Sequence, residues 1–214
     1  TPEQQAAAMQ VIAALTAVFA VAHSVVAAWT WRSLRSNWPL DLAYFHQQVR
    51  SLSLGQGFAQ TVHWHESQTM LGNSHFTPIL VLAAPVQRLW PGLDSLLATQ
   101  CFVVSLLGIG AARLARSQGG RPAVAVLAAV VALGSAPLWQ VTQTDLRPLV
   151  WSASLLVMLA AALAEARPRE ALIWAFLASA CREEVPLLVL AVCALHGAGP
   201  EWRSRARRAA PSVL

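Results

Sequence analysis

Six apolar runs separated by charged gaps constrain the fold of this 214-residue chain more than any other feature. The runs cover residues 7–29, 94–113, 122–140, 148–165, 170–181 and 185–197. About 20 apolar residues form a helix that crosses the hydrocarbon core of a bilayer, so the last two runs are short for this purpose. The chain is 12% charged, whereas a soluble domain carries about 25% charged residues. The sequence therefore predicts an all-α fold: a polytopic transmembrane helical bundle of about six spans, in a single integral membrane domain of residues 1–214.

The arginines predict how the chain is oriented in the membrane. They form clusters in alternate gaps between the apolar runs: Arg113, Arg116 and Arg121; Arg167 and Arg169; and the arginines of residues 203–208. Cytoplasmic loops of membrane proteins collect Lys and Arg. We therefore expect a bacterial inner-membrane protein with both termini, and the arginine-rich tail 198–214, in the cytoplasm. The net charge of +5 is explained by this topology signal, which argues against a nucleic-acid partner.

Residues 32–93 are predicted to form an outer loop with interfacial or re-entrant helical segments. The first segment, residues 40–54, has helical spacing and is expected along the membrane surface, with Asn37 or Asp41 as its N-cap. Its apolar side consists of Leu42, Phe45, Val49 and Leu52. The second segment, residues 76–90, is apolar but only 15 residues long, and runs this short are often re-entrant. We expect it to stay on the outer side, because all the arginine clusters then lie inside.

Charged residues and a histidine in the other gaps are the candidates for a functional site. They are Asp41, His75, Asp145, Arg147, Glu183 and Glu184. A charged side chain in the hydrocarbon core costs about 2.5–3.5 kcal/mol, so it is kept mostly where it faces a cavity, a partner or a metal. The polar segment CREEVP at 181–186 is expected to dip into the protein, with a helix broken around Pro186. For Asp145 and Arg147 the alternative is a local ion pair on a surface loop.

Four stretches occur in the order typical of a known family: DLAYFHQ at 41–47, HFTPIL at 75–80, TDLRPL at 144–149 and CREEVPLL at 181–188. Over about residues 7–197 the chain thereby resembles a family of predicted prokaryotic membrane proteins of unknown function. That family is distantly similar to the GT-C glycosyltransferases, multi-span enzymes that use lipid-phosphate-linked sugars on the outer membrane face. The resemblance implies a GT-C-like N-terminal half, and a polyprenyl-phosphate sugar as a partner besides the lipid bilayer.

The same resemblance implies roles for the candidate residues. It makes Asp41, Glu183 and Glu184 catalytic, and His75, Asp145 and Arg147 substrate-binding. It also implies that Asp41 and Glu183 would hold a divalent metal ion, if one takes part. Sugar transfer needs a carboxylate that deprotonates the acceptor, and positive groups or a metal that stabilise the leaving phosphate.

The leading functional hypothesis is a GT-C-like membrane protein derived from a lipid-phosphate-sugar-dependent glycosyltransferase, in active or inactive form. Ala43 stands where the family usually has Gly, and the Glu expected after residue 147 is absent. These departures favour a second hypothesis, a non-catalytic accessory subunit of a larger energy-converting or pigment-containing membrane complex. His23, inside the first apolar run, would then hold a chlorophyll or haem; the simpler interpretation is a packed histidine bonded to a neighbouring helix. A third hypothesis is a small transporter component with Glu183 and Glu184 in the pathway.

Overall fold

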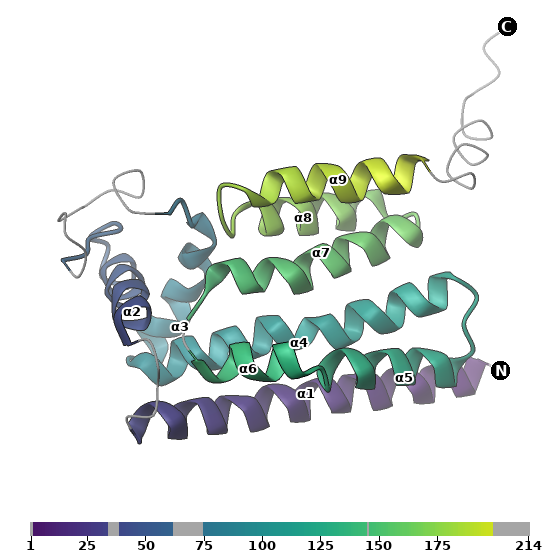
Figure 1. The fold of residues 1–214 in the computed structure, drawn as a ribbon, viewed down its shortest axis with the longest axis horizontal. Helices are drawn as coiled ribbons and strands as arrows, with labels where there is room; N and C mark the ends of the chain where they lie inside the picture. The colour runs from purple at the N-terminus through teal and green to yellow at the C-terminus, as the bar shows by residue number, and fades with distance from the viewer. Residues whose placement is uncertain (1, 34–38, 62–74, 145, 199–214) are drawn as a thin grey trace, which may run out of the picture.

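The computed structural model describes residues 2–33, 39–61, 75–144 and 146–198, which are almost entirely helical (Figure 1). The first half contains α1 (Pro2–Arg32), α2 (Pro39–Ser53), the 3-10 helix η2 (Pro78–Ala83), α3 (Ala84–Leu89) and α4 (Leu93–Ser117). The second half contains α5 (Pro122–Leu133), α6 (Ala136–Thr144), α7 (Pro148–Ala164), α8 (Pro168–Ser179) and α9 (Val185–Ala198). No strand occurs within the described ranges, so the predicted all-α class is confirmed.

Proline marks the beginning of most of these helices. It occupies the first or second position of α1, α2, η2, α3, α5, α6, α7, α8 and α9. The first turn of a helix has no intrahelical acceptors for its N–H groups, so a residue without an N–H is tolerated there but not in the interior. Pro186 is accordingly the second residue of α9. The predicted helix break lies just before Pro186, because residues 180–184 form a short turn between α8 and α9.

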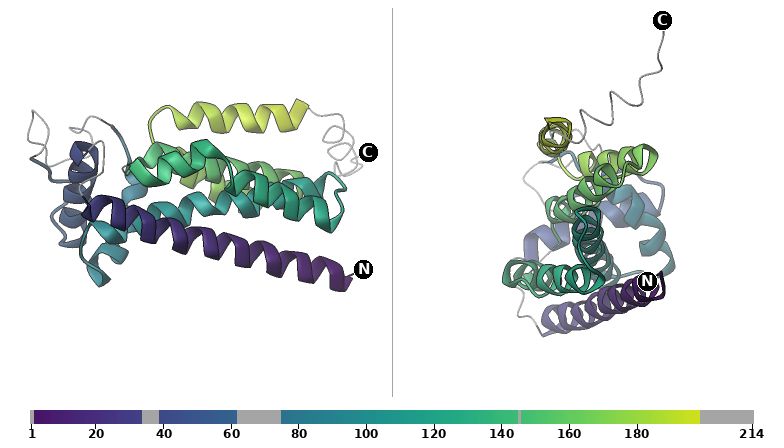
Figure 2. Two further views of the ribbon diagram at one scale, coloured as in Figure 1. Left: turned by 60° about the horizontal axis from the view of Figure 1, so that its bottom comes forward. Right: turned by 90° about the vertical axis from the view of Figure 1, so that its right-hand side faces the viewer.

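The longer helices lie side by side along one axis (Figures 1 and 2). At the centre, α4 contacts α1, α5 and α7, and α7 in turn contacts α8 and α9. In all views α1 and α9 lie on opposite outer sides of the bundle. α4, the pair α5 and α6, α7, α8 and α9 run alternately in opposite directions. The α4–α5 and α7–α8 connections therefore lie at one end, and the α6–α7 and α8–α9 connections lie at the other (Figure 1).

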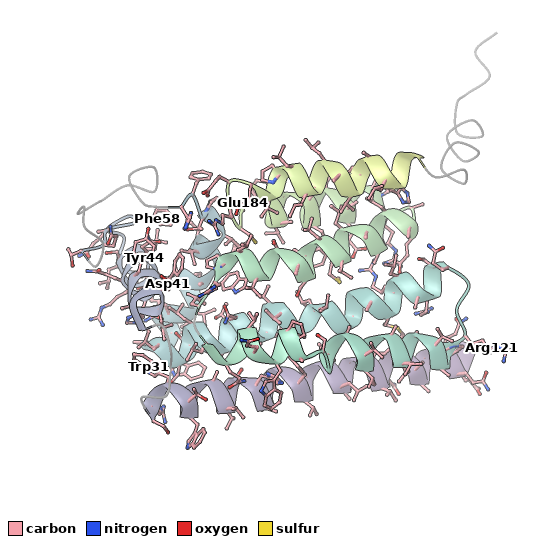
Figure 3. The ribbon with its side chains drawn as sticks, viewed as in Figure 1. Trp31, Asp41, Tyr44, Phe58, Arg121 and Glu184 are labelled. Atoms are coloured by element: carbon pink, nitrogen blue, oxygen red, sulfur yellow. The ribbon has the colours of Figure 1, made fainter. Side chains whose placement is uncertain are left out.

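The arginine clusters within the described residues share one end of the bundle. In Figure 3, Arg121 lies at this end, whereas Asp41 and Glu184 lie at the opposite end. Arg167 belongs to the same end as Arg121, because it follows α7 at the connection to α8. This arrangement agrees with the alternation predicted from the sequence. Which end faces the cytoplasm stays a prediction, and the arginines of residues 203–208 lie outside the described residues.

Two glycines let the neighbouring helices approach α4 closely. A Cβ atom on Gly108 would lie 2.8 Å from Leu133 Cδ1 of α5. A Cβ atom on Gly110 would lie 2.9 Å from Val157 Cγ1 and 3.2 Å from the backbone nitrogen of Met158, both on α7. Small residues at such contacts are typical of helices that pack in membranes, where backbone proximity replaces the hydrophobic driving force. The core of the bundle is therefore built on α4.

α2, η2 and α3 cap one end of the bundle, and α2 lies across this end rather than along the helix axis (Figures 1 and 2). The predicted apolar side of α2 is confirmed, because Leu42, Phe45 and Val49 are all buried. The predicted N-cap role of Asp41 is wrong: the helix begins at Pro39, and Asp41 lies in its first turn. Asn37, the other predicted cap, lies outside the described residues. Segment 76–90 stays at this same end, packed on α2.

Among the described residues, two helices are long and apolar enough to cross a membrane, α1 and α4, and α5 with α6 would make a third. The predicted span 122–140 is not one straight helix, because α5 and α6 meet at a bend of 46°. α8 and α9 have 12 and 14 residues. At 1.5 Å per residue they are about 18 and 21 Å long, shorter than the hydrocarbon core of roughly 30 Å. The count of six spans stays a prediction.

Large apolar side chains cover the outside of the bundle. Val18, Phe102, Phe176 and Leu195 are between 62% and 76% exposed. Monomeric soluble proteins rarely expose large contiguous apolar patches, and such patches mark protein or membrane contacts. The exposed apolar surface therefore agrees with contact between these helices and lipid.

Candidate functional site

A pocket of about 390 Å³ lies at the end of the bundle where α2 meets the beginning of α7. Its polar lining comes from four parts of the chain: α2, the segment before η2, the residue before α7 and the α8–α9 turn. The lining residues that carry polar or charged groups are Asp41, Tyr44, His75, Thr77, Arg147 and Arg182. Phe45 and the first residues of α7, Pro148 to Val150, supply the apolar wall. The pocket therefore combines both kinds of charge with an apolar wall.

Asp41 and Arg147 face each other across this pocket. The Oδ2 atom of Asp41 lies 4.0 Å from Nη2 of Arg147, and their side chains are 47% and 49% exposed. Exposed ion pairs contribute about 0–1 kcal/mol to stability, because water and salt screen them. The attraction between the two side chains therefore contributes little free energy, so a ligand can compete for either partner.

A buried amide fixes the backbone that carries Arg147. The backbone N–H of Arg147 donates a hydrogen bond to Oε1 of Gln100 on α4, at 2.9 Å. Gln100 is fully buried and its amide nitrogen donates to the carbonyl of Val141, at 3.3 Å. Arg147 also precedes the first turn of α7, whose N-terminal end carries the positive end of the helix dipole. The helix dipole and the guanidinium of Arg147 make this wall of the pocket favourable for an anion.

Beside the pocket, Glu183 joins the α8–α9 turn to the segment that precedes η2. Its Oε1 atom lies 3.1 Å from Nδ1 of His75, and its Oε2 atom accepts a hydrogen bond from the N–H of Phe76 at 3.0 Å. The N–H of Ile79 donates to the carbonyl of Ala180 at 2.9 Å, which ties the same two segments together. Glu183 is therefore placed to fix the position of His75 at the pocket.

Arg182 and Glu184 form a second ion pair in the same turn. Nε of Arg182 lies 3.0 Å from Oε1 of Glu184 and 3.9 Å from Oε1 of Glu183. The Arg182 Nε–H makes no hydrogen bond of good geometry within the described residues, so the contact with Glu184 is an electrostatic one. Arg182 lines the pocket. Glu184 does not line the pocket, but its carboxylate contacts the Arg182 guanidinium.

The pKa of Glu183 lies below its ordinary value of 4.5. Partial burial raises this pKa, but hydrogen bonds from the backbone N–H of Glu183, the side chain of His75 and the N–H of Phe76 outweigh that effect. A carboxylate whose pKa is lowered by folding stabilises the folded state above the unfolded-state pKa. This stabilisation is lost as the pH falls through the lower pKa of the folded protein.

Glu183→Gln is therefore expected to lower the melting temperature at pH 6 and to have a smaller effect at pH 3. The amide keeps an acceptor but cannot carry the negative charge whose interactions lower the pKa. The measurement is thermal unfolding of the detergent-solubilised protein at intervals from pH 6 to pH 3. Glu3→Gln, which removes an exposed carboxylate at the start of α1, is the control. A difference between wild type and Glu183→Gln that stays constant over this range would contradict the assignment.

The structure brings together most of the candidates predicted from the sequence. Asp41, His75 and Arg147 line one pocket, and Glu183 contacts His75 directly. Glu184 reaches the pocket only through Arg182. Asp145 lies outside the described residues. The catalytic and substrate-binding roles of these residues stay predictions.

His23, the predicted pigment ligand, lies inside the bundle and away from this pocket. Its side chain is buried, its ring stacks on Phe19 at 3.8 Å between centroids, and Trp139 contacts it edge-on. Its Nδ1 atom lies 2.6 Å from Oγ1 of Thr142 on α6. These contacts describe a packed histidine bonded to a neighbouring helix, while the pigment-ligand role stays a prediction.

A metal site at Asp41 and Glu183 requires further ligands close by. Within the described part of the chain, no group of three or more His, Cys, Asp or Glu side chains could hold a metal ion. Asp41 faces a guanidinium and Glu183 binds His75 and a backbone N–H. This donor set does not fit a divalent cation, which prefers several oxygen ligands.

The structure adds residues that the sequence did not identify as site residues. Tyr44, Thr77 and Arg182 line the pocket, and Gln100 positions Arg147 from within α4. Tyr44 follows Asp41 by three positions in α2, and helical spacing places such a residue on the same face. Gln100 carried only a weak signal, a lone amide in an otherwise apolar run.

Comparison with known proteins adds a family but no relative of known activity. No curated protein and no solved structure matches this chain. The profile of one protein family, described as "Predicted membrane protein (DUF2079)", matches residues 32–205. The matched region begins just before α2 and includes every described residue of the pocket. The chain therefore belongs to this family of predicted membrane proteins.

Proposed function

We propose that this protein is a GT-C-like glycosyltransferase that binds the phosphate of a lipid-linked sugar in the pocket beside α2, with Asp41 as the catalytic base. One observation carries the proposal: a carboxylate and two guanidinium groups, from Asp41, Arg147 and Arg182, line the same pocket. Transfer of a glycosyl group from a phosphate needs these two kinds of charge close to each other.

The positive side of the pocket suits a phosphate group. Guanidinium groups bind phosphate oxygens through paired N–H donors, and Arg147 and Arg182 both line the pocket. The beginning of α7 adds the positive end of a helix dipole, a common site for anions. The Arg147 guanidinium lies 4.0 Å from the Asp41 carboxylate, and both side chains are about half exposed, so solvent and ligands reach this contact.

Asp41 supplies the base for the transfer step. The hydroxyl oxygen of the acceptor attacks the anomeric carbon of the sugar while Asp41 takes the hydroxyl proton. The bond from the anomeric carbon to the phosphate oxygen breaks, and its electron pair leaves with the lipid phosphate. Arg147 and Arg182 stabilise the charge on that phosphate. No metal enters this scheme, in keeping with the donor set around Asp41.

The place of the pocket supports a substrate that carries a lipid chain. The pocket lies at the end of a bundle whose outer helices expose large apolar side chains. A lipid-linked donor keeps its chain among such helices while its phosphate stays at the membrane surface. The arginine clusters lie at the other end of the bundle, so the positive-inside rule favours a pocket on the outer side.

Binding of the donor tests the proposal. Arg147→Gln is expected to weaken the affinity for a polyprenyl-phosphate hexose at least about tenfold, because a hydrogen bond to a charged group contributes about 1.5–3 kcal/mol. The measurement is native mass spectrometry or thermophoresis of the protein in detergent. Arg50→Gln is the matched control, since Arg50 is an exposed arginine of α2 that does not line the pocket.

Two results would overturn the proposal. One is that wild-type protein binds no polyprenyl-phosphate sugar of a panel of hexoses and pentoses. The other is that Arg147→Gln and Arg50→Gln weaken binding to the same extent, which would indicate attraction by overall charge. An accessory-subunit role would instead be supported by purification of the chain within a stable assembly.

A further inference from the structure

We propose that a second cavity, at the opposite end of the bundle from Asp41, binds a phosphate group. The cavity has a volume of about 430 Å³. The lining residues come from the start of α1, the α4–α5 connection and the α7–α8 connection: Gln5, Arg116, Ser117, Gly119, Gly120, Glu165 and Arg167. It shares no residue with the pocket around Asp41, so the inference does not depend on the proposed glycosyltransferase activity.

The carboxylates near this cavity are already held by another arginine. Nη2 of Arg113 lies 2.7 Å from Glu165 Oε2, and Nη1 lies 2.5 Å from Glu170 Oε1. Arg113 also donates a hydrogen bond from Nε to Glu165 Oε1 at 3.2 Å and one from Nη2 to Glu170 Oε2 at 3.0 Å, so both contacts are bidentate. The side chain of Arg113 is only 11% exposed, so little water competes for it. Arg113 thus compensates one of the two negative charges of Glu165 and Glu170, and Arg167, which contacts the same two carboxylates, compensates the other.

The positive charge of Arg116 is available for an anionic ligand. Within the described residues, no carboxylate lies within ion-pair distance of its guanidinium, although this side chain is partly buried and lines the cavity. Arg167 lies 3.2 Å from Glu165 and 3.4 Å from Glu170, but it is 61% exposed and shares both carboxylates with Arg113. The cluster thus holds three guanidinium groups against two carboxylates, and an anion would balance it.

The backbone wall of the cavity is preformed. The N–H of Gly119 donates to the carbonyl of Arg116 at 2.9 Å, and the N–H of Gly120 donates to the carbonyl of Ala115 at 3.1 Å. Gly119 has a φ of +81°, a backbone conformation that residues other than glycine rarely adopt. A Cβ atom on Gly120 would lie 2.6 Å from the carbonyl oxygen of Ala115. The turn therefore keeps its shape without a ligand, and binding has little backbone ordering to oppose it.

A phosphate group fits this chemistry better than a carboxylate or a neutral ligand. Arginine binds phosphate oxygens through paired N–H donors, and Gln5 provides a neutral amide at the rim of the same cavity. The phosphate comes either from the headgroup of an anionic phospholipid or from a free phosphate in the adjoining solution. Basic clusters at membrane-protein ends attract anionic lipid headgroups, so both sources are tested in parallel.

The test compares Arg116→Gln with Arg121→Gln in the full chain in detergent. Arg121 is exposed, lies at the same end and does not line the cavity, so the two variants change the charge equally. The probes are phosphatidylglycerol, phosphatidylcholine as the neutral-headgroup control, and inorganic phosphate. Binding is measured as the rise in melting temperature with probe concentration, which follows the affinity for the folded state.

Arg116→Gln is expected to weaken binding at least about tenfold, since hydrogen bonds to charged groups are strong, while Arg121→Gln changes it less than about twofold. Stabilisation by phosphatidylglycerol but not by inorganic phosphate would assign the cavity to a lipid headgroup. Stabilisation by inorganic phosphate with the same dependence on Arg116 would assign it to a free phosphate. Stabilisation by neither probe, or an equal loss in both variants, would overturn the proposal.

Discussion

Asp41→Asn is expected to lower the rate of sugar transfer by about 10²- to 10⁴-fold, the range that a positioned general base contributes. The amide keeps the size and polarity of the carboxylate but cannot accept the proton of the acceptor hydroxyl. The affinity for the donor should change little, because the phosphate contacts come from Arg147 and Arg182. The measurement is the release of free polyprenyl phosphate from a lipid-linked sugar, followed by mass spectrometry in membrane vesicles of the expressing cells.

Asp94→Asn is the control for this experiment. Asp94 lies in the first turn of α4 and does not line the pocket. A transfer rate of Asp41→Asn within about twofold of wild type would contradict the role of Asp41 as base. Donor binding by wild-type protein without any release of polyprenyl phosphate would leave the phosphate site intact and identify the protein as an inactive descendant of such an enzyme.

Arg113→Ala is expected to cause the largest loss of stability among single substitutions of charged residues. Removing one partner of a buried ion pair costs about 3–5 kcal/mol, because the other charge is left without compensation. Glu165 and Glu170 are 21% and 27% exposed and keep Arg167 as a neighbour. We therefore expect the lower end of that range, about 3 kcal/mol, measured as reversible unfolding in detergent.

Replacement of all three charged side chains by uncharged ones distinguishes the ion cluster from simple loss of side-chain packing. When Arg113→Met is combined with Glu165→Gln and Glu170→Gln, much of the stability should return, since no buried charge is left unpaired. Arg121→Ala, an exposed arginine at the same end, should change stability by less than about 0.5 kcal/mol. Equal losses in Arg113→Ala and Arg121→Ala would show that the cluster contributes nothing specific.

Local sequence signals account for the parts of the fold that could be predicted. The helix predicted over 40–54 occurs as Pro39–Ser53, and the run predicted over 148–165 occurs as Pro148–Ala164. Proline sets both beginnings, and a proline effect depends on neighbouring residues alone. The bend between α5 and α6 is not visible in the mean hydropathy of residues 122–140, which are mostly apolar. The local signals for it are Gly134 and Pro137, residues that commonly end and begin helices.

The candidate site was predictable to a similar degree. Asp41, His75 and Arg147 lie in the alternate gaps between apolar runs that lack arginine clusters. Antiparallel packing of the helices brings these gaps to the same end of the bundle. Which side chains pair with each other depends on distances across the bundle. The contact of Glu183 with His75 spans 108 positions in the sequence, and no local pattern encodes it. The pairing of Arg147 with Asp41 has the same origin.

One helix connects the two ends of the molecule. Arg147 immediately precedes α7, and Glu165, which Arg113 holds, immediately follows it. A ligand that displaced α7 at one terminus would therefore change the surroundings of a charged group at the other terminus. Thermodynamic reciprocity fixes the form of any such coupling: by whatever factor an occupant of the arginine-rich cavity changes the affinity of the carboxylate-bearing pocket, an occupant of that pocket changes the affinity of the cavity by the same factor.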